Sequence, residues 1–596
     1  MKTFSYADVI LKSGYLSDKE ALNRNTTIEA VYHRFYDTGR IDAFDFNYKE
    51  GDEKKPHVFW DSDVAKWMEG ACYILKKHPN PALEQRVRAL VSKIKEHQCE
   101  DGYFNIYFTV CEPENRFTRE SMHELYCAGH LMEAAIAYAE ATGEQDFLAC
   151  MERYADYIKK VFVDDRSAGF AAPGHEEIEL ALVKMYEYTG KKKFLELAAH
   201  FINIRGREKD PACYDNQSHL PVREQHEAIG HAVRAVYLYT GMARLAKHTN
   251  DPALIAACKH LWEDITKKKM YVTGGIGSTH IGEAFTRAYD LPNDTAYAET
   301  CAGIGLIFFA QAMLELENNA QYADIIERAL YNGVLSGLSL DGKAFFYENP
   351  LEINLLEHIE LKRGKRRFPL TQRKEIFECS CCPPNINRLL SSLGNYIYGH
   401  DSDTLFVNQY ISSALDADGI HASLATEYPN KGTVKCRVIG VQKIAFRIPA
   451  WCEQYKISKP FVLENGYAVI ENDGSEVTLE FELAVQPIYA APELFRDAGR
   501  LCFMRGPVLY CAEGMDNPHL LHSYRVTPNA GVSESYDPYF GLMTLTVEAC
   551  HLYRDDGTLY ANHPPKRESA VLKLIPYNCF ANRGESDMLV WLHAEL

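Results

Sequence analysis

Hydrophobic residues over roughly the first 400 positions recur with the spacing of an amphipathic helix, in paired segments joined by short turns. Each pair has an apolar-striped segment, a turn at Thr-Gly or Asn-Asp-Pro, and a second segment with leucine or phenylalanine just inside its start. Five such helical hairpins are predicted, at 67–94, 134–160, 181–204, 241–265 and 308–335, and residues 387–399 are a candidate for a sixth. Their turns recur about every 45 to 70 residues, which indicates an array of stacked helix pairs.

The connections between these pairs are long and rich in glycine, histidine, tyrosine and acidic residues, as at 170–179 and 271–301. The pairs are also irregular in length, whereas an open solenoid tends to keep its period. Loops of this composition suit the mouth of a pocket. We therefore expect the array to close into an α/α barrel rather than remain an open solenoid.

The hydrophobic period changes after about residue 400, where short alternating runs rich in β-branched and aromatic residues begin. Glycine, aspartate, asparagine and proline separate these runs, which lie at 403–415, 435–451, 475–483, 499–511, 542–549 and 569–577. The pattern is typical of β-sandwiches. We expect a barrel domain at 1–400, a β-sandwich domain at 401–505 and a second β-sandwich domain at 506–596.

Charge and cysteine usage narrow the possible partners. The 596 residues carry 64 basic and 82 acidic side chains, a formal net charge of −18, which disfavours nucleic acid and anionic membrane surfaces as partners. No apolar run reaches the ~18 residues of a membrane span, and the first 21 residues lack the apolar core of a signal peptide.

The 17 cysteines are an odd number and mostly scattered, which indicates a reducing compartment. We expect a cytoplasmic protein.

Three cysteines occupy four positions in the stretch ECSCCPPN, namely Cys379, Cys381 and Cys382. Pro383 and Pro384 follow directly and stop any helix from running through them, so we expect a stiff segment. Three interpretations are open: buried inert cysteines, a redox Cys-x-x-Cys pair, and a metal site. The density of thiols disfavours the first, and the lack of a βαβ context disfavours the second.

A metal site needs further ligands, and the stretch AYAETCAGIG supplies Glu299 and Cys301, two residues apart at the start of a predicted helix. With Cys381 and Cys382 they make four ligands, three sulfurs and one oxygen, and thiolates select zinc. Four protein ligands normally define a closed structural site. A carboxylate is uncommon in such a site, however, and leaves one bond that exchanges more easily.

Four other residues are candidates for catalysis or binding. Glu283 precedes Glu299 by sixteen residues in a predicted loop, and His123, His175 and His231 each lie at the start of a helix pair. The alternative for each is ordinary: a solvated carboxylate, or a histidine that satisfies local backbone. Their common placement, on the side where a barrel opens, favours a functional role.

These residues stand in a series of motifs that resembles glycoside hydrolase family 127, the family of the β-L-arabinofuranosidases. In order, the motifs are HELYCAGHL, PGHEEIELALV, GHAVRA, GEAF, AYAETCA, FFYENPL and CSCCPPN, and the match continues through RGPVLYC. The resemblance implies an (α/α)6 barrel catalytic domain followed by β-sandwich domains. It also implies retaining, exo-acting hydrolysis that releases L-arabinofuranose from β-L-arabinofuranosides.

The resemblance assigns roles to particular residues. It implies Zn²⁺ held by Glu299, Cys301, Cys381 and Cys382, with Cys381 also the nucleophile and Glu283 the general acid/base. His123, His175, His231 and Tyr347 would line the sugar pocket, and Cys379 receives no role. A retaining mechanism needs a nucleophile on one face of the sugar and an acid at the leaving oxygen, so a thiolate here replaces one of two carboxylates.

Two other functions remain open. Families that share the scaffold act on other furanose sugars, so the resemblance indicates the chemistry more firmly than the substrate. A sugar epimerase with purely structural zinc and histidine acid/base pairs would not require Cys381 as nucleophile. In every case the expected partner is a small oligosaccharide or glycoside, and we hypothesise a homodimer formed through a β-sandwich domain.

Overall fold

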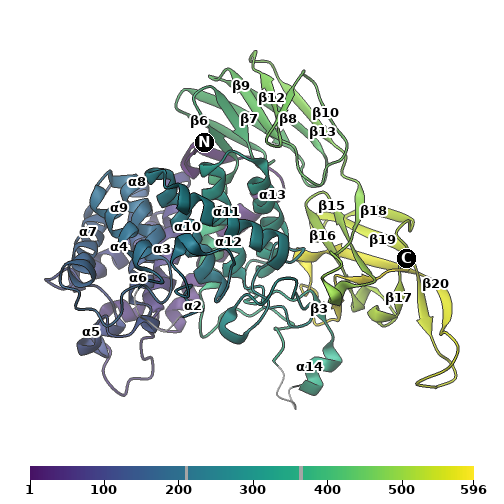
Figure 1. Cartoon of the computed structure of the whole chain (residues 1–596), viewed down its shortest axis with the longest axis horizontal. Coiled ribbons are helices and arrows are strands. Elements are labelled where there is room, and N and C mark those ends of the chain that lie inside the picture. Colours follow the sequence, from purple (N-terminus) through teal and green to yellow (C-terminus); the bar gives the residue numbers. More distant parts are fainter. Residues whose placement is uncertain (208–212, 362–366, 596) are drawn as a thin grey trace.

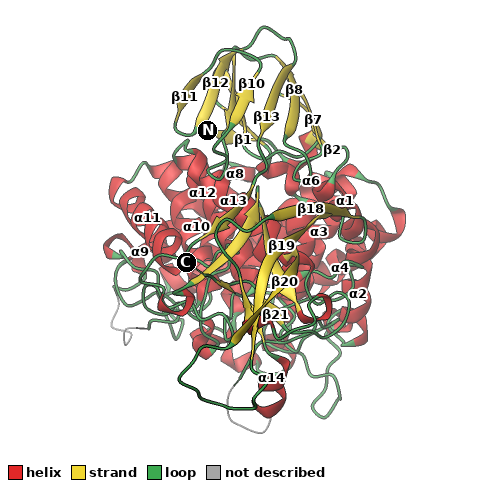
Figure 2. Ribbon diagram, turned by 90° about the vertical axis from the view of Figure 1, so that its right-hand side faces the viewer, coloured by secondary structure: helices red, strands yellow, loops and turns green. Residues whose placement is uncertain are grey.

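The computed structural model describes residues 1–207, 213–361 and 367–595. It consists of one helical domain and two β-rich regions (Figure 1). In a second view, β8, β10 and β12 lie above the helices, while β18, β19 and β20 cross in front of them (Figure 2). The mixed, multidomain fold class expected from the sequence is confirmed. No helix among the described residues is long and apolar enough to cross a membrane.

Six inner helices form a closed ring. Each contacts the next along the chain, and the last contacts the first, in the order α3 (Trp60–Lys77), α6 (Glu124–Thr142), α8 (Ile178–Thr189), α10 (Ala232–Thr249), α12 (Thr300–Leu316) and α15 (Cys382–Ser391). These helices are buried over most of their circumference, as helices inside a barrel must be. The array is therefore an α/α barrel and not a solenoid.

The outer helices return the chain between inner ones. They are α2 (Ile28–Asp37), α4 (Pro81–His97), α7 (Asp146–Lys159), α9 (Lys192–Ile204), α11 (Pro252–Asp264) and α13 (Ala320–Arg328). Each buries only one stripe: in α9 the stripe consists of Phe194, Leu197, Ala198, Phe201 and Ile202, spaced by one helical turn. The shorter helices α1 (Tyr15–Leu22), α5 (Tyr107–Val110) and α14 (Leu355–Leu361) lie outside this alternation.

The Thr-Gly turns end two inner helices as the sequence suggests. Gly143 and Gly190, with φ of 78° and 70°, adopt the left-handed conformation directly after α6 and α8, and each donates its N–H to a carbonyl of the last turn. That conformation disfavours residues with a Cβ atom. The chain then turns at once into the outer helix, so all inner helices run in the same direction.

The sixth inner helix begins earlier than the sequence indicated. Pro383 and Pro384 do not keep the helix away from the cysteines: they occupy the first turn of α15, and Cys382 is its first residue. A proline is tolerated there because the first helical N–H groups have no partner inside the helix. The segment CSCCPPN is thus a helix N-terminus.

Two six-stranded sheets follow the barrel. The first has the order β1-β4-β5-β9-β12-β11 and the second β10-β13-β8-β7-β6-β2. Their strands are β1 (Lys2–Thr3), β2 (Val9–Leu11), β4 (Tyr398–His400), β5 (Thr404–Val407), β6 (Ser413–Ala417), β7 (Ile420–Thr426), β8 (Thr433–Ile439), β9 (Lys443–Arg447), β10 (Tyr455–Ile457), β11 (Val462–Glu464), β12 (Tyr467–Glu471) and β13 (Val477–Phe481). All pairs are antiparallel except β5 with β9. Because β1 and β2 belong to these sheets, the chain's first strands lie outside the barrel that we had expected for residues 1–400.

The remaining strands form a ten-stranded sheet. They are β3 (Glu352–Ile353), β14 (Val485–Ile488), β15 (Arg500–Arg505), β16 (Val508–Glu513), β17 (Tyr524–Arg525), β18 (Val532–Asp537), β19 (Leu542–Tyr553), β20 (Lys566–Pro576), β21 (Met588–Leu589) and β22 (Leu592–His593). The boundary expected at residue 505 falls inside this sheet, since β15 pairs with β14 on one side and with β16 on the other. Strand pairing thus places the division between β13 and β14.

Candidate active site

One end of the barrel holds a cavity of about 340 Å³. Because the inner helices are parallel, the residues at their N-termini converge on it. Its lining includes Asp63, His123, Tyr126, His175, His231, Arg234, Glu283, Glu299, Cys301, Tyr347, Cys379 and Cys381. Every residue singled out in the sequence is among them except Cys382, which is fully buried behind Cys381.

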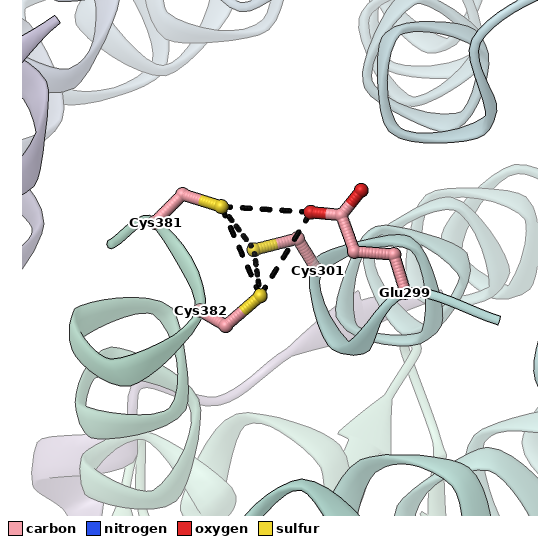
Figure 3. Close-up of side chains that lie close together, drawn as sticks. All are labelled: Glu299, Cys301, Cys381 and Cys382. Atoms are coloured by element: carbon pink, nitrogen blue, oxygen red, sulfur yellow. Dashed lines mark hydrogen bonds between the residues drawn. The ribbon is translucent and has the colours of Figure 1, made fainter. Parts of the chain in front are cut away.

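Glu299, Cys301, Cys381 and Cys382 form a compact cluster of four donor atoms (Figure 3). The Sγ of Cys301 lies 3.5 Å from that of Cys381 and 3.4 Å from that of Cys382, and the last two are 3.8 Å apart. The Oε1 of Glu299 is 3.5 Å from the Cys381 sulfur and 3.8 Å from the Cys382 sulfur. A tetrahedral zinc with Zn–S bonds of about 2.3 Å separates its sulfurs by about 3.8 Å, so the donor set fits such an ion.

The cluster is built from two helix N-termini. Glu299 occupies the N-cap position of α12, and Cys301 lies in the first turn of that helix. Cys381 occupies the N-cap position of α15, and Cys382 is the first residue of that helix. The positive ends of both helix dipoles therefore face the four donors and favour negative charge on them. Burial and the neighbouring Cys381 and Glu283 raise the pKa of Glu299 well above its usual range. These four donors could therefore be ionised together only with a cation between them, and the group could hold a metal ion.

Glu283 lies beside the cluster and contacts two predicted pocket residues. Its Oε2 is 3.1 Å from Nε2 of His231, and the hydroxyl of Tyr347 donates to it at 3.4 Å. Burial raises the pKa of Glu283, but His231, with further hydrogen bonds that involve Glu299 and Tyr297, lowers it to about 2. Glu283 also has a positive φ of 54°, a conformation that costs non-glycine residues about 1 kcal/mol or more.

The Tyr347 hydroxyl lies between the four-donor cluster and Glu283. This hydroxyl is 3.6 Å from the Cys381 sulfur and 3.4 Å from Oε2 of Glu283, so these two groups are at most about 7 Å apart. The same hydroxyl is 3.9 Å from the sulfur of Cys379. The Cys379 sulfur is outside the group of four converging donor atoms, although its side chain lines the cavity.

Three histidines form a row along the cavity wall. The ring centroids of His123 and His175 are 5.5 Å apart, as are those of His175 and His231. Burial and Arg234 lower the pKa of His123 to about 3 and hold that of His175 well below its usual value, and burial also lowers the pKa of His231. Neutral imidazoles both donate and accept hydrogen bonds, as sugar hydroxyls do.

Sequence reasoning missed several further lining residues, and three of them stand near the starts of inner helices. Asp63 and Tyr126 stand in the first turns of α3 and α6, and Arg234 in that of α10. The Tyr126 ring lies 4.1 Å from that of His175 and its hydroxyl accepts a hydrogen bond from Lys66 at 3.0 Å. Their position at the start of a helix pair is the signal that had identified His123, and it would have identified these residues too.

A six-pair helical barrel whose mouth holds a carboxylate, neutral imidazoles and a cysteine-rich group that could hold a metal ion suits an enzyme that binds a small polyhydroxylated substrate such as a sugar. Comparison with known proteins is consistent with this class and makes it specific. Three family models match in succession: the β-L-arabinofuranosidase catalytic domain of glycoside hydrolase family 127 over residues 8–395, its middle domain over 404–483, and its C-terminal domain over 485–593. The chain therefore belongs to glycoside hydrolase family 127 and is a glycosidase.

Individual relatives are similar to this protein over nearly its whole length. A non-reducing end β-L-arabinofuranosidase of Bifidobacterium longum is 38% identical over 595 residues, which cover 91% of this chain and 90% of the relative. The crystal structure of a family 127 β-L-arabinofuranosidase from Geobacillus stearothermophilus has a TM-score of 0.93 at 39% identity, covering 98% of this chain and all of the other. A further family 127 β-arabinofuranosidase has a TM-score of 0.91 at 33% identity, covering 100% of this chain and 98% of the other.

Proposed function

We propose that this glycosidase is an exo-acting, retaining β-L-arabinofuranosidase that releases L-arabinofuranose from the non-reducing end, with Cys381 as nucleophile. The observation that carries the proposal is the placement of Cys381 and Glu283 on one small cavity, with the Tyr347 hydroxyl between them. A cavity of about 340 Å³ is in the range of small-ligand pockets, which suits removal of one terminal sugar. The names of the similar enzymes support the choice of sugar.

Zn²⁺ is the proposed cofactor. Glu299, Cys301, Cys381 and Cys382 would hold it, because their donor spacing and their three sulfurs suit a tetrahedral zinc. When bound, zinc keeps the thiols deprotonated and so supplies a thiolate at neutral pH. Three thiolates and a carboxylate give the bound site a formal charge of −2, which limits the loss of nucleophilicity at sulfur.

In the first step the Cys381 sulfur attacks the anomeric carbon and the bond to the leaving oxygen breaks. Glu283 gives its proton to that oxygen. Burial of its carboxyl favours the protonated form of Glu283 that this step needs, whereas His231, Glu299 and Tyr297 favour the ionised form that the second step needs. The product of the step is a thioglycoside on Cys381.

In the second step Glu283 takes a proton from water, and the water oxygen attacks the anomeric carbon. The carbon–sulfur bond breaks and the Cys381 thiolate is restored. Each attack inverts the anomeric centre, so two attacks retain its configuration. His123, His175 and Tyr347 would meanwhile hold the sugar hydroxyls, since they line the same cavity and combine donors with acceptors.

A panel of aryl glycosides tests the proposed substrate. The aryl β-L-arabinofuranoside should be cleaved at least ~10-fold faster, in kcat/KM, than the corresponding α-L-arabinofuranoside or β-D-galactofuranoside, because a pocket built to hydrogen-bond particular hydroxyls discriminates strongly. Preference for another furanoside would instead favour the second candidate, a glycosidase on the same scaffold that acts on a different sugar.

One equivalent of zinc per chain is expected in protein purified without added metal, and elemental analysis measures it. Cys301→Ser should lower both the zinc content and the melting temperature, because the ligands join the start of α12 to the start of α15. Cys258→Ser is the matched control, since this buried thiol lies on α11 outside the donor group. Full activity in a metal-free preparation would contradict the assignment.

Two expectations from the sequence stay predictions: a cytoplasmic location, and a homodimer formed through a β-sandwich domain.

A further inference from the structure

Within the described ranges, the segment that precedes Cys381 is not held in place by hydrogen bonds between backbone groups. Among the described residues, positions 375–380 make no backbone hydrogen bond to other backbone groups, and the first one beyond them runs from Asn385 to the Cys381 carbonyl at 3.3 Å. The N-cap position that carries the proposed nucleophile therefore depends on side chains that bind the carbonyls just before it.

Arg40 is such a side chain. Its Nη2 donates to the carbonyl of Glu378 at 2.7 Å and to that of Phe377 at 3.4 Å, three and four residues before Cys381. Its Nε donates to Oδ2 of Asp63 at 3.0 Å. One planar guanidinium thus joins the nucleophile's segment to the first turn of α3, the element from which Asp63 lines the catalytic cavity.

The guanidinium is itself tightly held. Arg40 and Asp63 are only 2% and 1% exposed, so water does not reach the ion pair. Each charge therefore depends on the other for compensation. Nη1 donates to Thr38 at 2.9 Å, and the guanidinium carbon lies 5.2 Å and 5.4 Å from the rings of Trp60 and Phe35. Its donors are therefore fixed in direction, and lysine cannot reproduce such a fork with a single ammonium.

We propose that Arg40 is a positioning residue for the glycosidase reaction: held by Asp63, it fixes the carbonyls of Phe377 and Glu378 and thereby aims the Cys381 sulfur at the anomeric carbon. The inference rests on the proposed nucleophile role of Cys381. A purely structural buried ion pair would stabilise the fold without affecting how well sulfur and sugar are aligned. Misplacement of a reacting group by about 1 Å costs on the order of 10²-fold in rate.

The test compares Arg40→Met, Arg40→Lys and a control, Arg34→Met. Arg34 pairs with Glu375 of the same segment, but at the surface, with side chains 40% and 58% exposed. Single-turnover bond cleavage, KM, zinc content and melting temperature are measured for each, together with labelling of Cys381 by a bromoacetamide-bearing arabinofuranosyl probe. Rates are expressed per folded, zinc-loaded enzyme.

Arg40→Met should slow cleavage and probe labelling by about 10²-fold, with KM changed less than about threefold, and Arg40→Lys should fall between it and the wild type. Arg34→Met should match the wild type. Wild-type rates in Arg40→Met after correction for folding and zinc, or full recovery of its rate on zinc saturation, would overturn the inference. A wild-type enzyme that is not labelled at Cys381 would instead overturn the proposed function itself, whatever Arg40 does.

Discussion

Replacing Cys381 by alanine should reduce turnover on the order of 10⁴-fold or more, because the reaction loses the atom that forms the covalent intermediate. Cys381→Ser should be almost as inactive: a hydroxyl is a weaker nucleophile than a thiolate and a poorer zinc ligand. Steady-state kinetics on an aryl β-L-arabinofuranoside measures both. Both variants should still fold, although loss of a zinc ligand should lower the melting temperature, as in Cys301→Ser, so turnover is expressed per folded protein.

Two measurements separate a nucleophile from a mere ligand. Proton NMR of the first-formed product should show retained configuration, and mass spectrometry after treatment with a haloacetamide-bearing sugar should place the label on Cys381. Cys379→Ala is the matched control, because its sulfur is 3.9 Å from the Tyr347 hydroxyl but outside the cluster. Inversion at the anomeric centre, or substantial turnover by Cys381→Ala, would leave Cys381 as a ligand only.

Glu283→Gln should slow the cleavage of natural oligosaccharides by about 10²- to 10⁴-fold, the usual contribution of general acid/base catalysis. The amide cannot donate a carboxylic proton to the leaving oxygen, although it keeps the size of the side chain. An activated aryl leaving group needs little protonation, so its bond-breaking step should suffer much less. Single-turnover kinetics on both kinds of substrate makes the comparison.

The control for Glu283→Gln is Glu357→Gln, a surface carboxylate in α14 that is absent from the cavity lining. It should behave as the wild type on both substrates. An equal loss in Glu283→Gln for the oligosaccharide and the aryl glycoside, in the bond-breaking step, would show that Glu283 does not protonate the leaving group.

The helical hairpins were predictable because burial follows the chain's own period. Residues 134–160, for example, become the end of α6, a Gly143 turn and α7, and the residues buried in α7 repeat at helical spacing. The alternating runs became strands for the same reason: β7 buries every second residue, and β8 does so in the opposite phase.

Boundaries were less predictable, because they depend on partners outside the local sequence. A proline pair reads as a helix stop unless it falls in the first turn, and only the packing of α15 between α3 and α12 fixes where that turn begins. Likewise β15 follows a turn-rich stretch, yet its hydrogen bonds to β14 and β16 assign it to the C-terminal sheet.

The sequence by itself determined the periods of the elements and the identity of the chemical groups: three clustered thiols, a Glu-x-Cys pair, and histidines at the starts of helix pairs. The tertiary structure decided which of them meet. Ring closure brings α15 against both α12 and α3, so that Cys301 lies 3.4 Å from Cys382 and Arg40 reaches the carbonyl of Glu378. Contacts over such sequence separations arise from the joint packing of many apolar helix faces, which no local period encodes.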